Sequence, residues 1–115
     1  MAKALIMLVR VLGLAALVFG ALVWTGRPQY LGPHFGSGFI VAAVVFVLAV
    51  IALTKGGVVP GILGVVFAVL LPVVGLKQLP LTFHTLGAIQ VAHIALALAV
   101  IGVGESLYAA IRRAR

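Results

Sequence analysis

Polar residues are scarce along this chain, and they divide it into four long apolar segments. The segments cover residues 4–24, 35–53, 58–76 and 86–111. Each is close to the ~20 apolar residues that a helix needs to cross the hydrocarbon core of a bilayer. Because lipid does not tolerate unpaired backbone groups, each segment is predicted to be a transmembrane helix.

The connections between these segments are short, at residues 25–34, 54–57 and 77–85. Short connections favour antiparallel packing of consecutive helices, so the predicted fold is an all-α, up-down transmembrane four-helix bundle. At 115 residues, the chain is expected to form a single integral membrane domain over residues 1–115. Pro72 is predicted to kink the third helix or to end it early.

Small residues recur at heptad-like spacing in every segment, and such seams let helices pack closely in lipid. The large branched residues on the opposite side of the fourth segment are predicted to face lipid. The predicted seams are Gly13, Ala16 and Gly20; Gly38, Ala42, Ala49 and Ala52; Gly57, Gly61, Gly64 and Ala68; and Ala88, Ala92, Ala95, Ala99, Gly102, Ser106 and Ala109, and the lipid stripe is Val91, Ile94, Leu98 and Ile101.

Composition and charge strengthen the membrane interpretation. Hydrophobic residues make up 65% of the chain, against roughly 45–50% in soluble domains. The formal net charge of +7 does not indicate nucleic acid here, because the cations follow the positive-inside rule if both termini are cytoplasmic. Only Arg27 and Lys77 then lie outside. The basic cluster Arg112, Arg113 and Arg115 is expected to meet anionic head groups of the bilayer, or a protein partner.

The residue inventory excludes most enzyme classes. The chain has no Asp, Asn or Cys, and its one acidic residue is Glu105. The chain therefore lacks the residues needed for a pair of catalytic carboxylates, a catalytic triad or a two-metal site. The protein is expected not to be an enzyme, and no metal centre is predicted.

Arg10 and Glu105 are the charges closest to the middle of the predicted membrane region. An ionisable group at such depth is a functional candidate. The two residues lie at similar depth, so they can pair. The favoured interpretation is that each extends separately to the inner interface, and a third possibility is a proton-coupled transporter that uses Glu105.

Three histidines lie in the outer half of the predicted bundle: His34, His84 and His93. A neutral imidazole is a ligand for metal or haem. The best-matched pair is His34 with His84, at the outer ends of the second and fourth helices. Two axial imidazoles on facing helices hold b-type haem in four-helix membrane proteins, and His93, with Gln90 one turn before it, is the alternative ligand.

The surroundings of that pair suit a single haem b. Arg27 and Lys77 lie where the haem propionates would emerge. The flat macrocycle also needs small neighbours, and the expected ones are Gly36, Gly38, Gly87 and Ala88. Polar structural roles for the histidines stay open.

The two predicted outer loops share a weak repeat. Each contains a cation, a glutamine and a histidine that heads the next helix. Duplication of a helical hairpin explains this pattern, and chance explains it as well. The first loop has Arg27, Gln29 and His34, and the second has Lys77, Gln78 and His84.

Residues 30–105 resemble a group of small bacterial four-span membrane proteins. The resemblance is carried by His34, by 75–78 at the end of the third helix, and by His84, Gln90 and His93 in the fourth. More loosely, the plan is similar to the four-helix haem-binding halves of haem A synthase and to b-type membrane cytochromes, which place their ligands deeper. The resemblance implies at most one haem and a multi-pass protein of the bacterial inner (plasma) membrane.

Three functions follow from these observations. The first in rank is an accessory or structural subunit, or an assembly partner, of a larger membrane complex or homo-oligomer. Within it, the sharpest specific hypothesis is one haem b at the outer face that transfers electrons. The alternative is a small dimeric proton-coupled transporter or channel.

Overall fold

The computed structural model describes residues 1–78 and 87–115. Four α-helices, each long and apolar enough to cross a membrane, account for most of the described chain. The predicted all-α fold is confirmed, and the chain is a multi-pass membrane protein. The helices are α1 (Ala2–Trp24), α2 (Leu31–Thr54), α3 (Val58–Leu76) and α4 (Ala88–Arg113), and a 3-10 turn, η1 (Pro28–Tyr30), precedes α2.

The bounds of α3 agree with the prediction, whereas α2 begins earlier than predicted. The structure confirms α3 at the predicted bounds, and this helix continues past Pro72 to Leu76, so the predicted early end is wrong. Helix α2 begins at Leu31, earlier than expected, because η1 leads into it directly. Pro33 lies in the first turn of α2, where a missing N–H costs little.

Helices α1 and α2 end with the same glycine motif. In each, the residue after the C-cap is a glycine with positive φ, Gly26 at +93° and Gly56 at +84°. The N–H of Arg27 donates to the Leu22 carbonyl and the N–H of Gly57 to the Ala52 carbonyl, which is the Schellman pattern. Only glycine adopts this backbone without strain, so both helices stop where the sequence has Gly.

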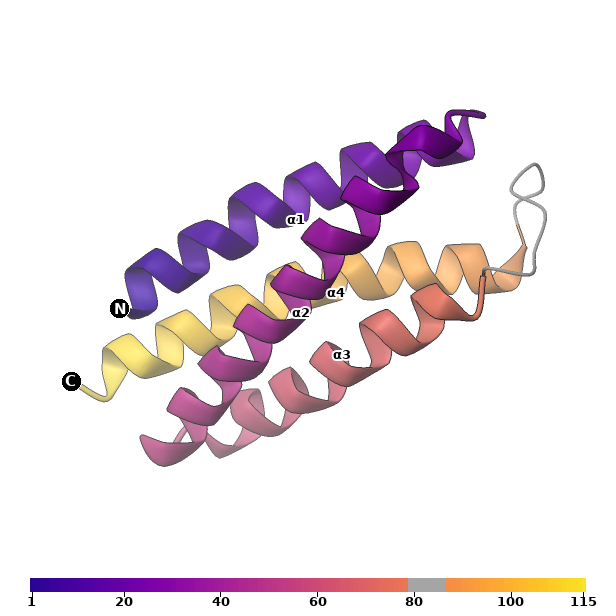
Figure 1. The fold of residues 1–115 in the computed structure, drawn as a ribbon. Coiled ribbons are helices and arrows are strands. Elements are labelled where there is room, and N and C mark those ends of the chain that lie inside the picture. The colour runs from indigo at the N-terminus through magenta and orange to yellow at the C-terminus, as the bar shows by residue number, and fades with distance from the viewer. Residues whose placement is uncertain (79–86) are drawn as a thin grey trace.

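The helices pack in an order that separates α1 from α3. Helices α2 and α4 cross at the centre of the bundle, α1 packs on them from one side and α3 from the other (Figure 1). In the described part of the chain, α1 and α3 make no contact with each other. Both chain termini and the α2–α3 turn lie at one end of the bundle, called here the terminal end. The opposite end, with η1 and the start of α4, is called the cavity end.

Three of the four predicted packing seams are confirmed. Gly13 on α1, Ala49 on α2 and Gly64 on α3 are buried. A Cβ on Gly64 would lie 2.7 Å from the Ala49 Cβ and 2.9 Å from a Leu107 methyl. These helices therefore approach as closely as small residues allow.

The predicted seam of α4 is wrong. Its small residues Ala92, Ala95 and Gly102 are exposed. The predicted lipid stripe is confirmed at Val91, Ile94 and Leu98, whereas Ile101 is only partly exposed and would touch a Cβ on Gly13. The face of α4 that packs inward carries Gln90, Val100, Gly104, Leu107 and Ile111.

Candidate functional site

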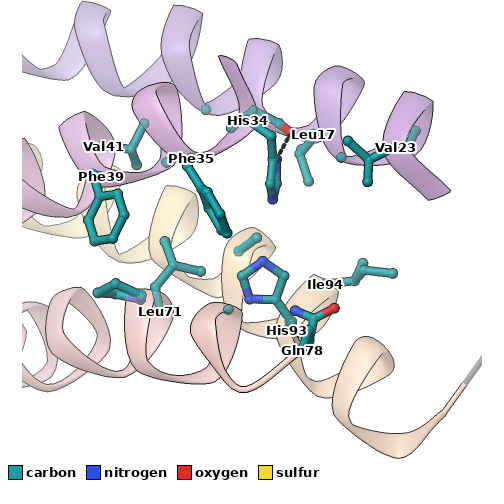
Figure 2. Close-up of a pocket in the computed structure, with 18 of the residues that line it drawn as sticks. Leu17, Val23, His34, Phe35, Phe39, Val41, Leu71, Gln78, His93 and Ile94 are labelled. Carbon is teal, nitrogen blue, oxygen red and sulfur yellow. Dashed lines mark hydrogen bonds between the residues drawn. The ribbon is translucent and has the colours of Figure 1, made fainter. Parts of the chain in front are cut away.

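An apolar cavity of about 290 Å³ opens at the cavity end, between the two hairpins (Figure 2). All four helices line it. Aromatic and aliphatic side chains form most of its wall, among them Phe35, Phe39 and Leu71. Its polar side chains are His34 from α2, His93 and Gln90 from α4, and Gln78 just after α3.

The His34 ring is held by helix α1. Its Nδ1 lies 2.8 Å from the carbonyl oxygen of Ala16. The ring reaches this carbonyl because Gly20, one turn further along α1, has no side chain: a Cβ there would lie 2.9 Å from the His34 Cε1. Since a carbonyl can only accept, Nδ1 carries the hydrogen, and Nε2 is the ring nitrogen left for a ligand.

The His93 ring is backed by helix α3 in the same way but is not held by a hydrogen bond. A Cβ on Gly75 would lie 2.9 Å from the His93 Cε1. The Nδ1 of His93 is buried and has no hydrogen-bond partner among the described residues, and the same holds for the Oε1 of Gln90, whose side chain is 8% exposed. Buried polar atoms without partners are rare and costly, so both atoms are candidates for bonds to a ligand.

The two imidazoles meet across the cavity. Their ring centres lie 6.0 Å apart and their planes are at 79°. Figure 2 shows the two side chains pointing toward one another from α2 and α4. No group of three or more His, Cys, Asp or Glu side chains suited to a metal ion occurs among residues 1–78 and 87–115, so the pair is the only imidazole arrangement described here that can hold a ligand from two sides.

The site is built from two similar halves. In the first hairpin, a histidine of α2 lies over a glycine of α1, and in the second, a histidine of α4 lies over a glycine of α3. The equivalence involves Gly20 with His34 and Gly75 with His93. It differs from the loop repeat predicted from the sequence, which matched His34 with His84, and duplication stays a prediction.

The predicted site residues are only partly brought together. His84 lies outside the described residues, and the partner that faces His34 is the alternative ligand, His93. Gln90 shares the cavity with His93, as its position one turn earlier suggested. Arg27 and Lys77 are exposed at the cavity end, Arg27 three residues after the cavity-lining Trp24 and Lys77 directly after the cavity-lining Leu76.

The expected small neighbours are mostly different ones. Gly36 is exposed and does not line the cavity, whereas Gly38 does. The glycines that matter for the imidazoles are Gly20 and Gly75, on the helices opposite each histidine. The predicted seams of small residues include Gly20 but not Gly75, and the sequence gives no sign of which ring each glycine accommodates.

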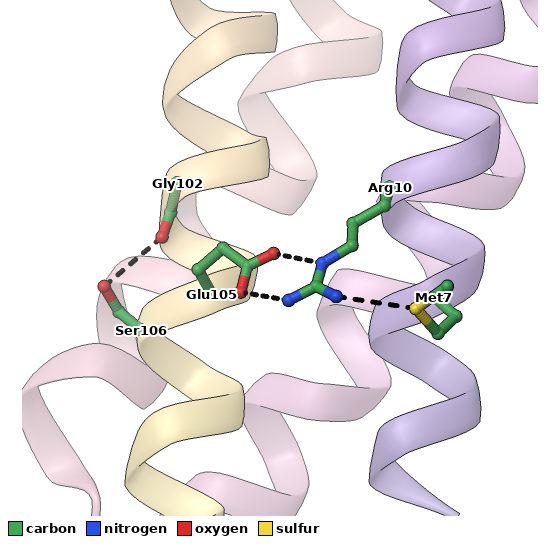
Figure 3. Close-up of polar contacts among 5 residues, drawn as sticks. All are labelled: Met7, Arg10, Gly102, Glu105 and Ser106. Carbon is green, nitrogen blue, oxygen red and sulfur yellow. Dashed lines mark hydrogen bonds and ion pairs between the residues drawn. The ribbon is translucent and has the colours of Figure 1, made fainter.

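Arg10 and Glu105 form an ion pair between α1 and α4, about one helical turn beyond the cavity-lining residues Gly13 and Ile101. The Nε of Arg10 donates to Oε1 of Glu105 at 2.7 Å and its Nη2 donates to Oε2 at 2.9 Å (Figure 3). The side chains are 48% and 41% exposed. Because a two-pronged guanidinium–carboxylate bond is the strong form of this contact, the pairing alternative is confirmed. The favoured interpretation, that the side chains extend to the inner interface, stays a prediction.

Comparison with protein-family models, with curated proteins and with solved structures finds no match for this chain. The resemblance stated from the sequence therefore stays a prediction. What the protein does has to be argued from the cavity and its two imidazoles.

Proposed function

We propose that this chain is a small, non-enzymatic protein of the bacterial inner membrane that binds one haem b between His34 and His93 and transfers electrons. In this role it is an accessory subunit or assembly partner of a larger membrane complex or homo-oligomer. The observation that supports the proposal is the pair of imidazoles that face each other across an apolar cavity at 6.0 Å.

The ligand geometry suits one metal atom between the rings. A metal–nitrogen bond of about 2.0–2.1 Å on each side, plus half the width of each ring, separates two ring centres by roughly 6 Å. The bond from His34 Nδ1 to the Ala16 carbonyl orients Nε2 as the ligand atom, as backbone carbonyls do for many metal-bound histidines. His93 has no such bond, so its ring can still turn toward a ligand.

The cavity is large enough for the centre of the haem macrocycle but too small for the whole ring. Small-molecule sites span about 300–1,000 Å³, and the cavity has about 290 Å³. Haem binding therefore requires the two hairpins to separate slightly, or the edge of the ring to extend into lipid. Arg27 and Lys77 lie near enough in the chain to meet propionates at the cavity end.

Bound haem would supply one-electron chemistry, and the residues of the chain have simpler tasks. His34 and His93 would hold the iron, and the apolar wall would exclude water, which favours electron exchange over reactions with solvent. The single bonded nitrogen of His34 keeps one half of the site rigid. The paired hairpins set the distance between the two ligands.

The test is an absorption spectrum of the detergent-purified protein, before and after titration with haemin. We expect one haem per chain with the spectrum of a six-coordinate bis-histidine centre. His34→Ala and His93→Ala should each abolish this spectrum. His84→Ala is the matched control, since it removes the histidine that the sequence had favoured, and it should leave the spectrum unchanged.

A colourless protein that also fails to take up haemin would reject the haem proposal. The accessory role is tested separately, by mild solubilisation from its own membrane. A partner that co-purifies in fixed ratio supports it, whereas a stable chain that purifies alone contradicts it.

A second candidate is a proton-coupled transporter or channel, and the observation that favours it is the Arg10–Glu105 pair within the apolar part of the bundle. A carboxylate that carries protons must leave its cation and return to it. Glu105→Gln should then abolish proton-driven flux in vesicles. Unaltered flux would exclude this function.

A further inference from the structure

A second polar feature lies at the terminal end, away from the imidazole cavity. A groove of about 480 Å³ runs between the α2–α3 turn and the last turn of α4. Lys55 and Arg113 line it from opposite sides, together with Gly57, Pro60 and Ala110. The groove brings two cations together that are far apart in the sequence.

Glycines make this approach possible. Gly56, with φ of +84°, reverses the chain directly after Lys55. A Cβ on Gly57 would lie 3.3 Å from the Ala110 Cβ, so the turn packs tightly against α4. Arg113 follows Ala110 by about one helical turn and therefore emerges beside the same turn.

The charges of this groove have no internal partner. The chain contains one acidic residue, Glu105, and its carboxylate is already bound by Arg10. Among the described residues that is the only ion pair, and residues 79–86 include no acidic side chain. Lys55 and Arg113 are exposed and form no ion pair among the described residues, so both are available to an anion from outside the chain.

Helices α2 and α4 end at the groove and α3 begins there, so the backbone contributes both negative and positive helix ends. The carbonyl oxygens of Ala52 and Leu53 at the end of α2 already accept bonds from the N–H groups of residues 55–57, which reduces the negative end of that helix. The groove also contains the first residues of α3, whose N-terminus carries a partial positive charge.

The walls of the groove point to a lipid as the source of the anion. Val58 and Val59 line it and are 54% and 71% exposed, so apolar surface adjoins the two cations. A free phosphate ion gains no binding energy from apolar surface, whereas the acyl chains of a lipid bury it. Basic pockets between transmembrane helices are typical sites for anionic lipid head groups.

We propose that this groove is a specific site for one anionic phospholipid, whose phosphodiester lies between Lys55 and Arg113 and whose acyl chains lie against Val58 and Val59. The proposal does not depend on haem binding. It differs from a general attraction of the basic cluster to the membrane surface, because lipid binding then depends on Lys55 and Arg113 and not on the neighbouring cations.

Native mass spectrometry of the full chain in detergent, with added phosphatidylglycerol or phosphatidylcholine, tests the site. We expect one phosphatidylglycerol to be retained per chain, in preference to phosphatidylcholine. Each of Lys55→Gln and Arg113→Gln should weaken its binding about fivefold, and the double variant roughly 30-fold.

The matched control is the double variant Arg112→Gln with Arg115→Gln, which removes the same charge at the same end. Arg112 lies over the Tyr108 ring, 5.7 Å from its centre, and neither residue lines the groove. This variant should change lipid binding less than about threefold. Equal losses in the two double variants, or no preference for phosphatidylglycerol, would overturn the proposal.

Inorganic phosphate separates the lipid from a free anion. If millimolar phosphate displaces the bound phosphatidylglycerol, the groove is an anion site without lipid specificity and the proposal is wrong. If the Lys55–Arg113 double variant does not purify, the two single variants measure the same effect, since each leaves one cation in place.

Discussion

The two halves of the cavity look alike but differ in one bond. In the first hairpin, His34 lies over Gly20 and donates to the Ala16 carbonyl at 2.8 Å. In the second hairpin, His93 lies over Gly75, and its buried Nδ1 has no partner among the described residues. The His34 ring is therefore hydrogen-bonded within the packed structure, whereas the His93 ring has a nitrogen that is free to bind a ligand.

This difference separates structural from functional roles for a buried histidine. A ring that is fixed by a backbone carbonyl contributes to folding even without a ligand, because its polar atom is satisfied. A ring with an unpaired nitrogen costs free energy until a ligand arrives. Replacing each ring by an apolar side chain should thus have similar effects on binding and opposite effects on stability.

The largest expected effect is on the ligand. His34→Ala and His93→Ala should each lower haemin affinity by at least about 100-fold, since even partners of metal ligands affect affinity by about 10–100-fold. Titration followed by absorption measures both affinities. If one variant retains wild-type affinity, the two halves do not hold the ligand together.

The next effect concerns the glycines. Gly20→Leu should lower the free energy of unfolding by about 3 kcal/mol, because it displaces His34 and breaks its bond to Ala16 as well as crowding the interface. Gly75→Leu should cost only about 1–2 kcal/mol, since His93 has no bond to lose. Unfolding in mixed detergent measures both; equal costs would contradict the comparison.

A smaller effect, of opposite sign in the two halves, is expected when each ring is replaced by an apolar side chain in the protein without haem. His34→Leu should destabilise by about 1 kcal/mol, because the ring loses its bond to Ala16. His93→Leu should stabilise by about 1 kcal/mol, because it removes an unsatisfied buried nitrogen. Thermal unfolding of the two variants gives the signs, and a loss of stability in both would show that His93 is satisfied in another way.

The smallest effect is expected at the ion pair. Glu105→Gln should leave haemin affinity unchanged within about twofold, since neither Arg10 nor Glu105 lines the cavity. A double-mutant cycle of Arg10→Gln with Glu105→Gln should show coupling in stability but none in binding. Coupling to haemin affinity would mean that the two sites communicate.

The sequence allowed the helices to be predicted well because hydrophobic length is a strong signal in membrane proteins. The bounds of α3 were predicted correctly, and the start of α2 was missed because the turn at Pro28–Tyr30 is polar in sequence but continues into the helix. The small residues of α4 were misjudged. Lipid is as apolar as a packed interface, so a stripe of alanines does not tell which side faces lipid.

The candidate site was predicted only in part. The sequence identified His34, His93 and Gln90, with His84 as the favoured partner of His34 and His93 as the alternative. His84 lies outside the described residues, and His93 is the histidine that faces His34. Helix α4 begins at Ala88, which puts His93 in its second turn. The pairing also depends on Gly20 and Gly75, and their relation to each ring appears only when the helices are packed.

The separation of α1 from α3 has a consequence for how the protein resists unfolding. Without a cysteine, the chain cannot join its two hairpins by a disulfide, and among the described residues they are held by packing, the α2–α3 turn and the Arg10–Glu105 ion pair. A metal atom bound by both rings would act as a removable cross-link between them. At a free ligand concentration 100 times its Kd, such a cross-link adds about 2.7 kcal/mol, so the lifetime of the assembled protein would follow the supply of its ligand.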